Sequence, residues 1–124
     1  MTGRIIVAEG NPYLGDFYFR HLILNGVKPE DIEIVPDYET LISKVKEEDP
    51  KIVFLDSPNG RPNGKLCVIR DVREHSDVPV NLAYRSSPDI PLELIIKEAD
   101  KLGDVSVTDK NGKNYLSSFL KINP

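Results

Sequence analysis

Four polar residues of this 124-residue chain stand at, or just after, the end of a short apolar run. Glu9 follows RIIVA, Asp56 follows KIVFL, Tyr84 ends VPVNLAY, and Lys110 comes shortly after VSVT. If the runs before Glu9 and Asp56 are neighbouring strands, their backbones lie ~4.8 Å apart. Two carboxylates would then share one cleft, which requires either a cation between them or a proton on one of them.

A hard divalent cation such as Mg²⁺ suits oxygen ligands. Lys110 would add a second positive charge, able to meet a phosphoryl group. The three residues Glu9, Asp56 and Lys110 therefore predict a small site for a cation and a phosphate. Two simpler interpretations stay open. Asp56 could be an ordinary turn residue, and Lys110 could be a solvated residue of the turn-like sequence Asp-Lys-Asn-Gly.

The apolar runs predict five strands, and their unbroken apolar character is typical of parallel strands covered on both faces. These strands are expected at residues 4–8, 32–35, 51–55, 78–84 and 105–108. Helix signals lie between them: caps at Asn11 and Asp37, an opening at Asn63 or Gly64, and a stop at Gly103. The apolar residues expected to face the core in the last three helices are Leu66, Ile69 and Val72; Leu92, Ile95, Ile96, Ala99 and Leu102; and Leu116, Phe119 and Leu120.

The alternation of strand and helix predicts the α/β class, with a three-layer, doubly wound, five-stranded parallel sheet. Ligands of such folds bind outside the carboxyl ends of the strands. The chain contains no repeat and no linker-like stretch, so we expect residues 1–124 to form a single domain.

Composition restricts the function further. Apolar residues make up 40% and charged residues 29% of the chain, and the net charge of −4 comes from well-mixed acids and bases. This balance disfavours direct nucleic-acid binding. No apolar stretch reaches membrane-spanning length, and the N-terminus lacks the layout of a signal peptide, so we expect a cytoplasmic protein with no membrane partner. The single cysteine, Cys67, is interpreted as a packing residue.

Most of the chain resembles the receiver domain of bacterial response regulators. The segments that carry the resemblance are RIIVAEGNP (4–12), PKIVFLD (50–56), DVPVNLA (77–83) and KLGDVSVTDK (101–110). The resemblance implies the strand order 2-1-3-4-5 of a flavodoxin-like (βα)5 fold. It also implies that Asp56 accepts a phosphoryl group from a histidine kinase and that Lys110 contacts the phosphate. The implied Mg²⁺ ligands are Glu9, Asp56 and the backbone carbonyl of Pro58.

Several positions depart from the family pattern. Gly10 stands where a second acid normally ligates the metal, so we expect only weak Mg²⁺ binding. The strand-four position of a switch Ser or Thr reads Tyr84 in one register and Leu82 in the other. Val107 replaces the aromatic residue of strand five, and Asn111 replaces a proline. These departures remove part of the metal site and both ends of the usual switch.

Two hypotheses follow from the resemblance: a phosphorylatable receiver, and an atypical receiver or pseudo-receiver that signals through protein contacts. Neither is an enzyme, and neither needs an organic cofactor. A histidine kinase or another signalling protein is the expected partner. The expected contact face, which a homodimer could also use, comprises the fourth helix, fifth strand and fifth helix and displays Lys97, Lys101, Ser106 and Lys113.

The alternative is a small flavodoxin-like enzyme or nucleotide-binding domain unrelated to phosphorelay. Gly60 and Gly64 could belong to a ligand-binding turn. The chain has no GxGxxG motif and no P-loop, and it has no tryptophan to stack on a flavin. The sequence therefore favours the receiver hypotheses.

Overall fold

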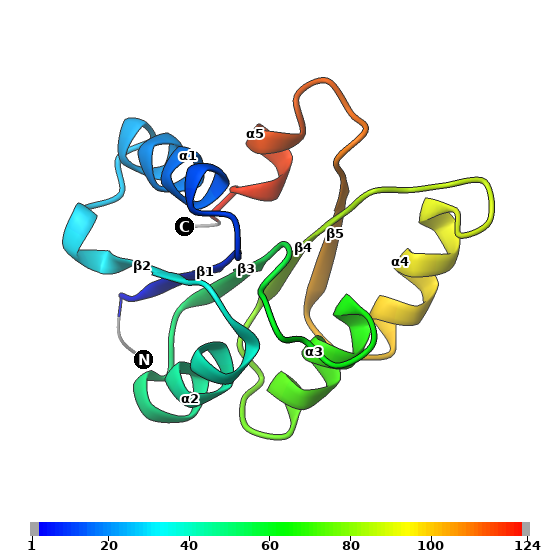
Figure 1. Cartoon of the computed structure of the whole chain (residues 1–124), viewed down its shortest axis with the longest axis horizontal. Coiled ribbons are helices and arrows are strands. Elements are labelled where there is room, and N and C mark those ends of the chain that lie inside the picture. Colours follow the sequence, from blue (N-terminus) through cyan, green and yellow to red (C-terminus); the bar gives the residue numbers. More distant parts are fainter. Residues whose placement is uncertain (1–2, 123–124) are drawn as a thin grey trace.

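The computed structural model describes residues 3–122, which form one parallel sheet and its covering helices (Figure 1). The strands are β1 (Ile5–Ala8), β2 (Ile32–Val35), β3 (Ile52–Leu55), β4 (Val80–Tyr84) and β5 (Val105–Asp109). The helices are α1 (Pro12–Leu24), α2 (Tyr38–Glu48), α3 (Lys65–Arg73), α4 (Leu92–Asp100) and α5 (Tyr115–Phe119), with a short 3₁₀ turn η1 (Pro29–Asp31). The strand order β2-β1-β3-β4-β5 confirms the predicted topology.

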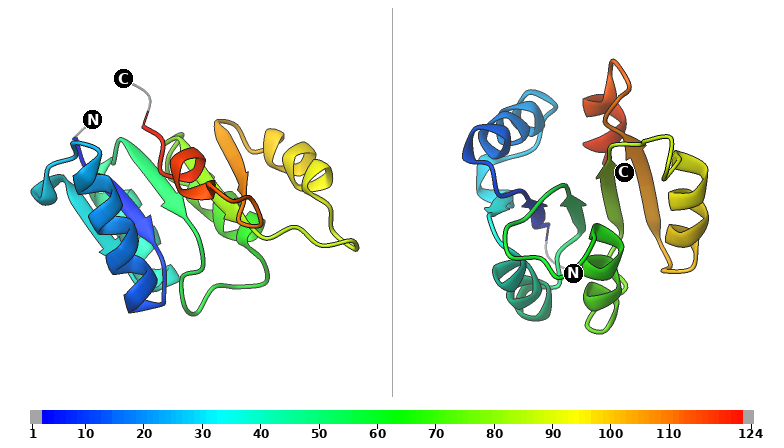
Figure 2. Two further views of the ribbon diagram at one scale, coloured as in Figure 1. Left: turned by 90° about the horizontal axis from the view of Figure 1, so that it is seen from above. Right: turned by 45° about the vertical axis from the view of Figure 1, so that its right-hand side comes forward.

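The helices cover both faces of the sheet, as two separate core clusters show. One cluster joins α1 and α5 to the sheet through Tyr18, Leu22 and Phe119. The other joins α2, α3 and α4 to the opposite face. Figures 1 and 2 show the resulting layers, with α1 and α5 on one side and α2 and α3 on the other. The central strands β1 and β3 are fully buried, as their unbroken apolar sequences predict.

The predicted helix caps are present. The Asn11 side chain accepts hydrogen bonds from the backbone N–H groups of Tyr13 and Leu14, and Asp37 accepts one from Thr40. Gly64 is the N-cap of α3, which decides between the two predicted openings. No described helix is both long enough and apolar enough to cross a membrane.

The fourth and fifth helices differ from the sequence prediction. In α4, Ile95 and Ala99 are buried, but Ile96 is 39% exposed because this helix lies beside β5 at the edge of the sheet. The fifth helix ends at Phe119, and Leu120 is buried just beyond it. The predicted apolar stripes are therefore correct in the core and too wide at the edge.

Arg73, the last residue of α3, connects the two segments that lead into β4 and β5. Its guanidinium donates hydrogen bonds to four backbone carbonyls, at distances from 2.5 to 3.2 Å. These carbonyls belong to Ser76, Val78, Leu102 and Asp104. The C-terminal end of α3 is therefore fixed to the segment that connects α4 and β5.

Candidate functional site

Asp56 lies directly after β3, at the carboxyl edge of the sheet, and its side chain is fully buried. Lys110 follows β5, and its Nζ atom lies 3.0 Å from Oδ2 and 3.2 Å from Oδ1 of Asp56. The Lys110 side chain is only 14% exposed. The interpretation of Lys110 as a solvated turn residue is therefore wrong, although the residue does belong to a turn.

Three further residues, which were not predicted from the sequence, contact Asp56. The Ser57 hydroxyl donates a hydrogen bond of 3.2 Å to Oδ1. The Tyr18 hydroxyl of α1 donates a hydrogen bond of 2.5 Å to Oδ2. Lys65, the first residue of α3, places its Nζ atom 3.2 Å from Oδ1 and 2.8 Å from the backbone carbonyl of Ala83. One buried carboxylate thus lies between two ammonium groups and a phenol.

These contacts keep Asp56 ionised. Burial opposes ionisation, but the hydrogen bond from Tyr18 and the charges of Lys65 and Lys110 outweigh it and hold the pKa of Asp56 below its usual value. Burial lowers the pKa of Lys65, and the charge of Asp56 opposes this effect. Burial also raises the pKa of Tyr18, and the hydrogen bond to Asp56 adds to the shift. The phenol therefore remains a hydrogen-bond donor.

Glu9 lies beside Asp56, and backbone groups hold its carboxylate. Its two carboxylate oxygens accept hydrogen bonds from the backbone N–H groups of Asn11, at 2.8 Å, and Ser57, at 3.0 Å. Burial raises the pKa of Glu9, these hydrogen bonds oppose the rise, and the charge of Asp56 adds to it. Glu9 therefore holds the two site loops in place from the end of β1.

The position of the missing second acid is filled by another side chain. A Cβ atom built on Gly10 would lie within 3 Å of three side-chain atoms of Asn59, which occupies the space beside it. Asn59 is anchored there through its backbone, which donates a hydrogen bond to the carbonyl of Pro36 and accepts one from the N–H of Tyr38 at the start of α2. The loop after β3 is thus held against the neighbouring loop, and the Asn59 side chain occupies the space that a side chain at position 10 would enter.

The donor set does not fit a Mg²⁺ ion. Asp56 already contacts two ammonium groups, which would repel a divalent cation. The carbonyl of Pro58 accepts a hydrogen bond of 3.3 Å from the guanidinium of Arg61. Glu9 is the one other carboxylate, and within residues 3–122 no group of three or more His, Cys, Asp and Glu side chains could hold a metal ion. The ammonium groups of Lys65 and Lys110 therefore supply the positive charge at Asp56 that a bound metal ion would otherwise supply.

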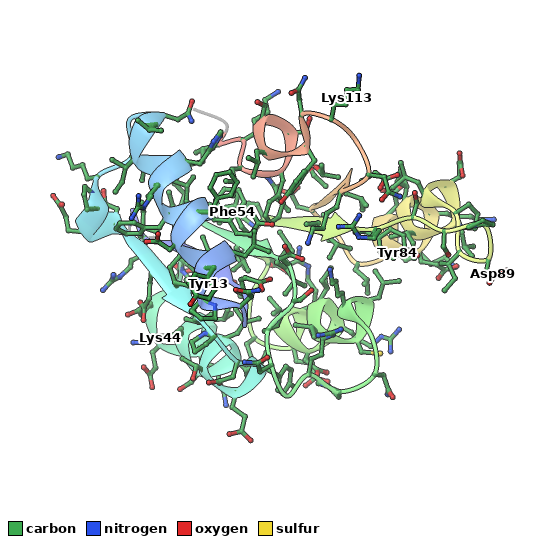
Figure 3. The ribbon with its side chains drawn as sticks, turned by 45° about the horizontal axis from the view of Figure 1, so that its top comes forward. Tyr13, Lys44, Phe54, Tyr84, Asp89 and Lys113 are labelled. Carbon is green, nitrogen blue, oxygen red and sulfur yellow. The ribbon has the colours of Figure 1, made fainter. Side chains whose placement is uncertain are left out.

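The hydroxyl groups at the end of β4 point elsewhere. The Tyr84 hydroxyl donates to the backbone carbonyl of Ile90 at 3.0 Å, and the Ser86 hydroxyl donates to Asp109 at 2.5 Å. Figure 3 shows Tyr84 beside the ribbon of α4. Val107 packs against the apolar core beside α4. The hydroxyl groups of Tyr84 and Ser86 therefore contact other residues and not Asp56.

No protein-family model matches this chain, and no curated protein matches it. Solved structures do match. The receiver domain of the Francisella response regulator 1452 has a TM-score of 0.73 and 15% identity, over 96% of this chain and 91% of that one. The chemotaxis protein CheY4 of Vibrio cholerae has a TM-score of 0.68 and 12% identity, over 94% of this chain and 92% of that one.

The chain has the fold of a response regulator receiver domain. A structure named adenylate cyclase, from Rhodopirellula baltica, is also similar, with a TM-score of 0.71 and 14% identity over 97% of this chain and 85% of that one. Because the sequence identities are only 12–15%, the similarity to these three structures shows a shared fold and does not show a shared function.

The low pKa of Asp56 predicts how stability changes with pH. Because the folded state holds this pKa below 3.8, the ionised group stabilises the fold above that pH, and the contribution is lost as the pH falls through the lower folded value. We expect wild-type stability to fall more steeply than that of Asp56→Asn when the pH is lowered from about 5 to about 2.5. Urea unfolding of both proteins across this range measures the difference, and parallel curves would contradict the prediction.

Proposed function

We propose that this receiver fold is a signalling module of two-component (phosphorelay) pathways that acts through protein contacts, without phosphorylation of Asp56. The observation that carries the proposal is the complete occupation of the Asp56 carboxylate. Both oxygens are hydrogen-bonded, the side chain is fully buried, and two lysines supply the positive charge. The histidine-kinase pathway itself is inferred from the fold.

Phosphorylation of an aspartate requires one carboxylate oxygen to attack a phosphorus atom, and a cation to neutralise the charge that develops. Here Oδ2 is covered by Tyr18 and Lys110, and Oδ1 accepts hydrogen bonds from Ser57, Lys65 and Lys110. An incoming phosphoryl group would have to displace a hydroxyl group and at least one ammonium group from whichever of these buried oxygens it approached. The arrangement supports Asp56 as an organising charge of the fold rather than an acceptor.

The face formed by α4, β5 and α5 is our proposed partner surface, including for a second copy of the chain. Its residues Lys97, Lys101, Ser106 and Lys113 are all exposed. Lys101 pairs with Glu98 of the same helix, and the charges of Lys97 and Lys113 favour a partner with an acidic surface. We further propose that the module is not an enzyme, uses no organic cofactor and works in the cytoplasm.

Incubation with acetyl phosphate and Mg²⁺, followed by intact-mass measurement, tests the proposal. We expect no mass gain, and no change in the spectrum of backbone amides with beryllofluoride and Mg²⁺. A phosphorylatable receiver treated in parallel controls for the reagents, and Asp56→Asn gives the background. A mass gain in the wild type that disappears in Asp56→Asn would overturn the proposal.

A further inference from the structure

A cavity of about 450 Å³ opens beside the Asp56 site, where the N-terminal ends of α3 and α4 meet the end of β4. Cavities of about 300–1,000 Å³ are typical of small-molecule sites. Residues from three parts of the chain line it: Ser57 and Arg61 before α3; Gly64, Lys65, Leu66 and Cys67 at its start; and Leu82, Tyr84, Arg85, Ile90 and Ile95 from β4 to α4.

The charges of this cavity differ from those of the whole chain. Arg61, Lys65 and Arg85 line it, and none of its lining residues is acidic, although the chain has a net charge of −4. Arg61 and Arg85 each use one guanidinium nitrogen in a contact, with the Pro58 carbonyl and the Asn111 side chain. A guanidinium carries several N–H donors, so both retain donors for a ligand. The cavity therefore suits an anion.

The remaining walls are mainly apolar and include Leu66, Leu82, Ile90 and Ile95, together with Tyr84. An inorganic anion would leave these walls in contact with water. A molecule that carries both an apolar body and one anionic group would cover the walls and meet the cations. The combination indicates an aliphatic or aromatic carboxylate.

The start of α3 adds to the attraction for an anion. Gly64, its N-cap, has no side chain, and no side chain caps this helix. The first N–H groups of a nine-residue helix carry partial positive charge and favour an anionic partner. This feature supports the site because the cavity and the three cations already define it.

Lys65 connects the cavity with Asp56. It lines the cavity, and its Nζ atom contacts Oδ1 of Asp56 and the carbonyl of Ala83. A flexible lysine can redirect its ammonium group towards a second anion. A carboxylate in the cavity would therefore compete with Asp56 for the same positive charge.

We propose that the cavity between α3, β4 and α4 binds a small organic carboxylate with an apolar body, and that Lys65 contacts the carboxylate when it is bound. The binding site itself does not depend on the proposed function. A role of the ligand in signalling rests on the proposed function, because it would replace phosphate as the input.

Octanoate is the probe, and Cys67 is the reporter. Cys67 is the chain's single cysteine, is half-buried and lines the cavity, so its alkylation by iodoacetamide reports occupancy. We expect saturating octanoate to slow this alkylation at least tenfold, and 1-octanol at the same concentration to slow it much less. We expect the double variant Arg61→Gln, Arg85→Gln to lose most of the protection.

The control variant is Arg20→Gln, which removes an exposed arginine of α1 far from these residues in the sequence and should keep full protection. Calorimetric titration with octanoate gives a second, independent measure of binding. Equal protection by octanoate and 1-octanol, or unchanged binding in the Arg61→Gln, Arg85→Gln variant, would overturn the inference. Phosphorylation is measured separately by mass, so failure of this site and failure of the proposed function are distinguishable.

Discussion

Asp56→Asn is expected to lower the free energy of unfolding by about 3–5 kcal/mol, the range for breaking a buried ion pair from one side. The change leaves Lys65 and Lys110 close together, 16% and 14% exposed, without the negative charge that both contact. It also leaves Tyr18 with a neutral acceptor in place of a carboxylate. Urea denaturation at neutral pH, followed by circular dichroism, measures the loss.

Asp16→Asn is the matched control. Asp16 forms an ion pair with Arg20 on α1, but its side chain is 56% exposed, so we expect a loss of about 0–1 kcal/mol. In a site with several acids and no lysine, the change at Asp56 would relieve repulsion and raise stability. An Asp56→Asn protein as stable as wild type, or more stable, would therefore show that the two lysines do not neutralise Asp56.

The double variant Gly10→Asp, Lys65→Met is expected to gain Mg²⁺ binding that the wild type lacks. It adds a carboxylate next to Glu9 and removes from Asp56 one of the two ammonium groups that would compete with the metal. The side chain introduced at position 10 must displace the exposed, flexible end of Asn59, which can turn towards solvent. Mg²⁺ at about ten times its dissociation constant should then raise the free energy of unfolding by about 1.4 kcal/mol.

Each single variant serves as a control for this experiment. Gly10→Asp retains both lysines on Asp56, and Lys65→Met retains Glu9 as the one carboxylate beside Asp56, so each should respond less than the double variant. Thermal unfolding with and without Mg²⁺ measures the response. A wild type that Mg²⁺ stabilises as much as the double variant would show that the tethered lysines do not exclude the metal.

The fold and three residues of the site were predictable from the sequence, and both follow from the properties of parallel strands. Strands that are apolar throughout must be buried in a parallel sheet, and the carboxyl ends of parallel strands meet at one edge. Glu9, Asp56 and Lys110 follow strand ends, so their convergence was predictable. Their roles in phosphorylation and metal binding remain predictions, because the contacts show where the three side chains lie and not how they react.

Tyr18 and Lys65 were missed because they belong to helices. The apolar residues of α1 spread around most of its surface, so its buried face could not be chosen from the sequence. Lys65 did carry a signal: a lysine in the first turn of a helix is opposed by the helix dipole. Such a local conflict often marks a functional position, and here the nearby carboxylate of Asp56 compensates for it.

The four hydrogen bonds of Arg73 have a mechanical consequence. They hold the C-terminal end of α3 to the segment that follows α4, whereas the N-terminal ends of both helices border the cavity. The helix pair is thus hinged at one end. A change in cavity width should displace the first turn of α4 more than its last, so α4 would pivot about the end near Arg73 and move the exposed Leu94 more than Lys101.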